Sequence, residues 1–287
     1  MTEAKKVSIP KFGEKLSEDA VLARNGLIAV SDGAGGGGVF ADHWAKYLVS
    51  NLPEVPICSF PNFDAWIDGI WESFYNEHEI LAKQEGGMFL DKFYDEGSFA
   101  TLVAVWKESE NECRWMSYGD SVAFCYDRNN GELQHSFTRL VDFNRPPYLI
   151  NCKDPLDEKG FRGGTFHTSK TSVVFCASDA LAHMLLMLYE IWLKQLGSNR
   201  FDSEIEAAIN AQTKNSQYIK LASSKTIDFD RELKYFLRLS KNNLGFRSGM
   251  YMHRNRLKIV AEDDYSLAVL DYNEEAFDEC SPLINID

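Results

Sequence analysis

Short apolar runs separated by polar turns fill much of the chain, and runs of this length predict strands. They cover 21–23, 26–30, 98–106, 114–117, 122–126, 132–137, 172–177 and 267–270. Two of the turns between them, 24–26 and 128–131, contain Asn-Gly, which is typical of β-hairpins. Apolar residues at helical spacing instead predict helices over 40–49, 63–83, 181–196 and 202–211. Strands joined by hairpins and kept apart from helices favour an α+β fold with antiparallel sheets.

A glycine-rich turn that begins with an aspartate follows one of the predicted strands. Asp32 stands one serine after the apolar run 26–30, and five of the next six residues are glycines. Glycine lets an ion or a ligand come close to the main chain, so Asp32 is a candidate cation ligand. A phosphate loop does not fit, because Val39 and Phe40 stand where that motif needs Gly-Lys-Ser/Thr. A dinucleotide fingerprint does not fit either, because its acidic residue lies on a later strand.

Acidic residues stand beside five predicted strands in all. In chain order they are Glu18 with Asp19, Asp32, Asp120, Asp179, and Asp263 with Asp264. A carboxylate beside a buried strand is costly unless something pairs with it, and few lysines or arginines occur in these motifs. A divalent cation would neutralise such a group, and all-oxygen ligation suits Mg²⁺ or Mn²⁺ rather than zinc. Each motif taken alone can also be a simple turn or a helix cap.

The order of these motifs resembles the metal-dependent type 2C protein phosphatases, the PPM family. The matching segments are 18–20 (Glu-Asp-Ala), 32–36 (Asp-Gly-x-Gly-Gly), 119–121 (Gly-Asp-Ser), 178–179 (Ser-Asp) and 263–266 (Asp-x-x-Ser). Segment 97–103 also resembles the family's Gly-Ser/Thr-x-x-Thr strand. The resemblance covers about residues 12–272 of a single domain, 1–287. It implies a four-layer α-β-β-α sandwich in which two antiparallel sheets are stacked face to face.

The resemblance also implies a metal site and a reaction. Asp32 would bridge two ions, Mn²⁺ or Mg²⁺. The Gly33 carbonyl and Glu18 would serve one ion, and Asp179 and Asp263 would serve the other. Water activated by these ions would remove phosphate from phosphoserine or phosphothreonine in a protein. The substrate would then be a phosphorylated protein made by a counterpart Ser/Thr kinase.

The resemblance assigns roles to two further residues, and other positions differ from the family pattern. Asp19 would hold a water bound to the ions, and Asp120 would match the ligand of a possible third ion. Glu14 stands where the family has a phosphate-gripping arginine. The adjacent Lys15 is a candidate catalytic residue that could replace this arginine as a point charge, although a solvated lysine is the alternative. In addition, Asp264 replaces the usual asparagine.

The missing arginine leaves two other functions open. One is a pseudophosphatase that binds a partner without turnover, and the other is a phosphatase of small molecules. All the carboxylates expected to bind metal are present, which favours an active enzyme over the first alternative.

Composition narrows the choice of partners and compartment. The net charge of −13 argues against nucleic-acid binding, which needs a basic surface. The six cysteines form no C-x-x-C pair, and Cys125 and Cys176 stand in apolar runs as expected of buried small side chains. The polar N-terminus does not read as a signal peptide, and the longest apolar stretch, about 181–193, is too short to span a membrane. We therefore expect a cytoplasmic protein that binds neither nucleic acid nor membrane.

Overall fold

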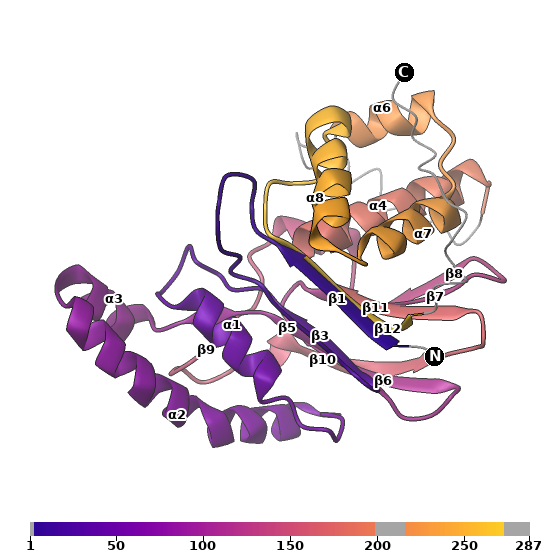
Figure 1. The fold of residues 1–287 in the computed structure, drawn as a ribbon. Helices are drawn as coiled ribbons and strands as arrows, with labels where there is room; N and C mark the ends of the chain where they lie inside the picture. Colours follow the sequence, from indigo (N-terminus) through magenta and orange to yellow (C-terminus); the bar gives the residue numbers. More distant parts are fainter. Residues whose placement is uncertain (1–2, 199–215, 273–287) are drawn as a thin grey trace.

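Two five-stranded antiparallel sheets lie face to face in the computed structural model, which describes residues 3–198 and 216–272 (Figure 1). One sheet has the spatial order β1 (Glu3–Ile9), β12 (Tyr265–Tyr272), β11 (Ser172–Ala177), β7 (Val122–Asp127) and β8 (Glu132–His135). The other has the order β10 (Phe161–His167), β6 (Glu112–Tyr118), β5 (Leu102–Lys107), β3 (Leu27–Ser31) and β2 (Ala20–Arg24). A small third sheet pairs β4 (Phe99–Ala100) with β9 (Ile150–Asn151).

Helices cover the outer faces of both large sheets (Figure 1). On the β3 side they are α1 (Ala41–Ser50), α2 (Phe60–Glu85) and α3 (Gly87–Glu96). On the β11 side they are α4 (Asp179–Gln195), α6 (Ser216–Ser224), α7 (Phe229–Leu239) and α8 (Asn243–Tyr251). Short helical segments occur at η1 (Leu140–Asn144), η2 (Glu158–Gly160) and η4 (Met252–Leu257). The predicted α+β fold, a four-layer α-β-β-α sandwich, is confirmed.

Three apolar layers hold the sandwich together, one between the sheets and one under each group of helices. Strand β3 shows why its sequence is apolar without alternation. Ile28 and Val30 pack between the sheets, while Leu27 and Ala29 pack beneath α1 and α2. Both faces of a strand in this position are buried, so both sets of alternating side chains are apolar. Cys125 and Cys176 lie in the layer between the sheets, as their apolar surroundings predicted.

Most predicted elements lie within a few residues of their observed bounds, but two long strands were not predicted. Strand β10 contains Gly163 and Gly164, which are unusual inside a strand. The ring of Trp115 lies across this strand, and a Cβ at position 164 would stand 2.6 Å from its Cζ2 atom. The edge strand β1 is rich in charge, with its apolar Val7 and Ile9 buried. Neither sequence has the apolar run that indicates a strand.

Helix α4 is buried along most of its length, which confirms the predicted apolar face. The predicted helix at 202–211 lies outside the described residues. Among the helices that the structure describes, none combines the length and the apolar character needed to cross a membrane.

Candidate active site

The first two acidic motifs meet at one end of a β-hairpin. Asp19 precedes β2 and Asp32 follows β3. The two strands are antiparallel, with Ala20 paired to Ser31, so the start of one lies beside the end of the other. The hairpin register therefore brings Asp19 and Asp32 to the same edge of their sheet.

The facing sheet brings three more acidic residues to one edge in the same way. Ala177, the last residue of β11, pairs with Leu267 of β12 and with Val122 of β7. The segments that adjoin these three residues are thus neighbours, and they carry Asp179, Asp263 and Asp120.

The acidic residues of both sheets interact around Asp32. This half-buried carboxyl group has lost much of its hydration, which raises its pKa well above the usual value. Four carboxylates raise the pKa further by repulsion: Asp19, Asp179, Asp120 and Asp263. Loss of hydration also raises the pKa of Asp179, and repulsion from Asp120, Asp263 and Asp19 raises it further. Five residues from separate loops therefore form one acidic cluster.

Asp19 is the most deeply buried member, with an exposed fraction of 4%. Burial raises its pKa to about 7, and the side chains of Ser266 and Asp32 lie beside it. Even so, neither carboxylate oxygen of Asp19 has a hydrogen-bond partner. A buried polar group without a partner calls for an ion or an ordered water. The orphaned oxygens of Asp19 fit the role of holding a water near a cation.

The donor atoms of the cluster are all oxygens, as hard cations such as Mn²⁺ and Mg²⁺ prefer. Within residues 3–198 and 216–272, however, no three histidine, cysteine, aspartate or glutamate side chains are already arranged to hold a metal ion. Repulsion between unneutralised carboxylates opposes such an arrangement. The residue types fit a site for hard cations, whose positive charge would relieve this repulsion.

The glycine-rich turn makes room for Glu18. A Cβ on Gly35 would stand 2.0 Å from Glu18 Oε1, so only glycine leaves this carboxylate in place. A Cβ on Gly33 would stand 2.7 Å from the Glu18 backbone oxygen and 2.8 Å from that of Ala41. The Gly33 carbonyl accepts the Gly35 amide at 3.1 Å. The turn therefore packs against Glu18 through Gly33 and Gly35, directly after Asp32 in the chain.

Asp264 fixes the segment that carries Glu18. Its buried carboxylate accepts the backbone N–H of Lys11 at 2.7 Å and that of Glu18 at 2.6 Å. Asp264 thus acts as a brace between the start of β12 and the loop before β2. The two bonds go to different oxygens of the carboxylate. An asparagine has one carbonyl oxygen, so its NH₂ group would face one of the two N–H donors.

A lysine that the sequence did not single out lies at the cluster. The Lys11 ammonium forms an ion pair with Asp263 at 3.1 Å. Partial burial lowers the pKa of Lys11, but attraction from Asp263, Asp264 and Glu18 raises it by more, so the net shift is upward. Lys15, the sequence candidate, is exposed, and its ammonium forms no hydrogen bond or ion pair with a described residue. Lys11 was missed because its partner lies about 250 residues further along the chain.

Thr101 joins the loop of Asp32 to the loop of Asp120. Its hydroxyl accepts the Asp32 amide at 3.2 Å and lies 2.7 Å from the Ser121 hydroxyl. Ser31 donates to the Thr101 carbonyl at 2.6 Å. Residue types at 97–103 suggested a family strand, and the structure shows that Thr101 positions the acidic loops.

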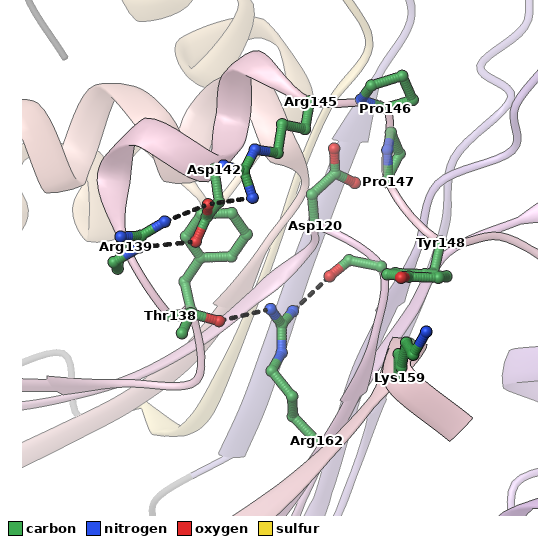
Figure 2. A pocket seen from close by; sticks show the side chains of 13 residues that line it. Asp120, Thr138, Arg139, Asp142, Arg145, Pro146, Pro147, Tyr148, Lys159 and Arg162 are labelled. Carbon is green, nitrogen blue, oxygen red and sulfur yellow. Dashed lines mark hydrogen bonds and ion pairs between the residues drawn. The ribbon is translucent and has the colours of Figure 1, made fainter. Parts of the chain in front are cut away.

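Asp120, a member of the acidic cluster, also lines a cavity of about 490 Å³ (Figure 2). Burial raises its pKa to about 6, Arg162 lowers it, and Asp263 raises it. Arg162 of β10 donates to Ser117 at 2.9 Å and also to the Gly119 carbonyl. These bonds fix the guanidinium beneath the turn that carries Asp120. The sequence contains no signal for this arginine, because β10 itself was not predicted.

Comparison with known proteins gives the class of fold. No family model and no curated protein sequence matches the chain. Among solved structures it is similar to the serine/threonine phosphatase PstP/Ppp of Mycobacterium tuberculosis, with a TM-score of 0.50 and 15% identity over 94% of this chain and 98% of that one. The chain has the fold of the PPM-type Ser/Thr phosphatases, which confirms the resemblance drawn from its sequence.

Two further structures support the same fold. One is the catalytic domain of PstP in complex with two manganese ions, with a TM-score of 0.50 and 15% identity over 93% of this chain and 96% of that one. The other is a bacterial serine phosphatase in which one arginine is replaced by glutamate. Its TM-score is 0.50, with 13% identity over 95% of this chain and 99% of that one.

Proposed function

We propose that this protein is a metal-dependent phosphomonoester hydrolase that removes phosphate from phosphoserine and phosphothreonine in proteins. One observation carries the proposal: five acidic residues from separate strand ends converge around Asp32 in a fold of the phosphatase class. In a purely structural cluster, repulsion between these carboxylates would only destabilise the fold. Divalent cations bound between them would relieve it.

The proposed ligands follow from their positions. Asp32 lies between the acidic residues of both sheets and would bridge two ions, Mn²⁺ or Mg²⁺. Glu18 and the Gly33 carbonyl would complete one side, and Asp179 and Asp263 the other. Asp120, at the border of the cavity, would hold the third ion. When bound, such ions lower the pKa of water and neutralise charge on phosphate oxygens.

Other residues would handle the water and the phosphate. The buried carboxylate oxygens of Asp19 have no hydrogen-bond partner and would hold a water bound to the ions. The Lys11 ammonium lies beside Asp263, where it can contact an anionic phosphate oxygen. Lys15 is the alternative candidate for that contact, and substitution of each lysine in turn would show which of them binds the phosphate.

The proposed function also implies a substrate, a partner enzyme and a compartment. A phosphorylated protein would be the substrate, and a Ser/Thr kinase would supply it. We treat residues 1–287 as a single catalytic domain that acts in the cytoplasm, without nucleic-acid or membrane partners. The net charge of −13 supports the first of these exclusions.

Turnover of three substrates tests the proposal. The protein is incubated with a phosphothreonine peptide, an aryl phosphate and a phosphorylated sugar, each with Mn²⁺ and with excess chelator. We expect Mn²⁺-dependent release of phosphate, with the peptide turned over at a higher kcat/KM than the sugar. Preference for the sugar would support the small-molecule alternative. No turnover of any substrate, together with binding of the phosphopeptide, would support a pseudophosphatase.

A further inference from the structure

The cavity beside Asp120 is unusual in this acidic protein because basic side chains dominate its wall. Its charged lining consists of four basic residues, Arg139, Arg145, Lys159 and Arg162, and two acidic ones, Asp120 and Asp142. The excess is two positive charges, whereas the whole chain has a net charge of −13. Phe137, Pro146, Pro147 and Tyr148 add an apolar part to the wall.

On one side of the cavity, one carboxylate pairs with two arginines. Asp142 lies between two arginines, 3.3 Å from Arg139 Nη2 and 3.5 Å from Arg145 Nη1. Figure 2 shows these three side chains together on one side of Asp120. Since 70% of the Arg145 side chain is exposed, this arginine can turn toward a second anion.

Lys159 stands on the other side of Asp120 in the same view (Figure 2). Its side chain is exposed, and its ammonium forms no ion pair with any residue in the described ranges. Arg162 lies below, held by Ser117, Gly119 and Thr138. The cavity therefore has one fixed cation at its base and two adaptable cations at its rim.

We propose that this cavity is a subsite for a second anionic group of the substrate, a carboxylate or a second phosphate close to the phosphate that is removed. Asp120 belongs both to the acidic cluster and to the cavity wall, so the two sites are contiguous. A peptide whose phosphate lies at the cluster would place its neighbouring side chains in the cavity. This inference rests on the proposed function for the identity of the substrate.

The charge arrangement also explains how an acidic protein can select an acidic substrate. The net charge of the chain repels anions at long range, but screening limits this effect to about 10 Å at ordinary ionic strength. Within that distance, the adaptable cations Arg145 and Lys159 set the local field. They would favour peptides with acidic residues next to the phosphorylated one and would leave a small aryl phosphate unaffected.

The test compares three phosphoserine peptides that differ only in the two flanking residues, which are glutamine, glutamate or phosphoserine. The variants are Lys159→Ala and Arg145→Ala. Lys170→Ala is the matched control, because Lys170 is an exposed lysine just before β11, at the strand end opposite Asp179. The values of kcat/KM are measured with Mn²⁺, and binding of the corresponding non-hydrolysable phosphonate peptides to the Mn²⁺-loaded protein is measured by fluorescence anisotropy.

For the wild type we expect kcat/KM to be about three- to tenfold higher with a glutamate-flanked peptide than with a glutamine-flanked one, as a few exposed charge pairs allow. Each cavity variant should lose most of that preference, while Lys170→Ala keeps it and aryl phosphate turnover stays unchanged in all three variants. A larger preference for the phosphoserine-flanked peptide would identify phosphate as the favoured second anion.

The turnover and binding measurements together distinguish a failure of the subsite from a failure of the proposed function. If no substrate is turned over but the acidic peptides still bind more tightly to the wild type than to the cavity variants, the proposed function fails and the subsite stands. If turnover is normal and the acidic and neutral peptides are used and bound equally, the subsite is overturned.

Discussion

The two lysines in the loop before β2 differ in what they touch. Lys11 forms an ion pair with Asp263, and Lys15 is exposed. We predict that Lys11→Ala raises KM for an aryl phosphate by roughly ten- to hundredfold, because a hydrogen bond to a charged group contributes about 1.5–3 kcal/mol. The change should fall mainly on KM, because a contact equally strong in the bound substrate and the transition state does not alter kcat.

Lys15→Ala serves as the matched control, since it removes the same charge from the same loop. Steady-state kinetics with saturating Mn²⁺ should give near wild-type values for this variant. A raised KM in Lys15→Ala, with Lys11→Ala unaffected, would return the phosphate contact to Lys15.

Residue identity revealed the acidic cluster but not its supporting residues. Asp32 and Asp179 could be predicted because each follows an apolar run after a single serine, a position where an unpaired carboxylate is costly. The ion pair of Lys11 and the two backbone hydrogen bonds of Asp264 could not. These contacts join the first 20 residues to the start of β12, and no local pattern encodes such a pairing.

The glycine-rich turn offers a sharper test of one element. In Gly35→Ala, the new Cβ would displace the Glu18 carboxylate, which is the flexible end of a side chain and can move away at small cost. We therefore predict that the variant keeps wild-type thermal stability but needs a higher Mn²⁺ concentration for half-maximal activity. Gly36→Ala is the control, because nothing lies within 4 Å of its added Cβ.

Equal Mn²⁺ requirements in Gly35→Ala and Gly36→Ala would show that Glu18 does not contribute to metal binding. A large loss of stability in Gly35→Ala would show that the turn has a structural role beyond placing this side chain.

At the scale of elements, the sequence predicted the strands that carry a short apolar run and missed two that do not, β1 and β10. Strand β3 has the unbroken apolar run of a buried strand. Strand β10 carries an arginine and two glycines, because Arg162 supports the turn of Asp120 and Gly164 accommodates Trp115. The requirements of neighbouring elements thus overrode the usual composition of a strand.

For the whole molecule, the acidic cluster links stability to pH when metal is absent. Asp19 has a pKa of about 7 in the folded state, against an ordinary value of 3.8. The folded protein therefore holds this proton more tightly than the unfolded chain does. The resulting stabilisation is complete below the ordinary pKa and is lost as the pH rises through about 7.

Asp19→Asn isolates this effect, because asparagine resembles the protonated acid and does not titrate. In excess chelator, we predict that Tm of the wild type falls relative to that of the variant between pH 5.5 and pH 8. Thermal denaturation at both pH values measures the difference. A constant difference in Tm would mean that Asp19 does not carry the raised pKa.

The most direct test of the whole account is a Mn²⁺ titration of aryl phosphate hydrolysis by the wild type and by Asp32→Asn. The account predicts that the wild-type rate rises with Mn²⁺ to a plateau and vanishes with excess chelator. It also predicts that Asp32→Asn has almost no activity at any Mn²⁺ concentration, because one carboxylate serves both proposed ions. A wild-type rate that persists in chelator, or an Asp32→Asn rate close to that of the wild type, would contradict it.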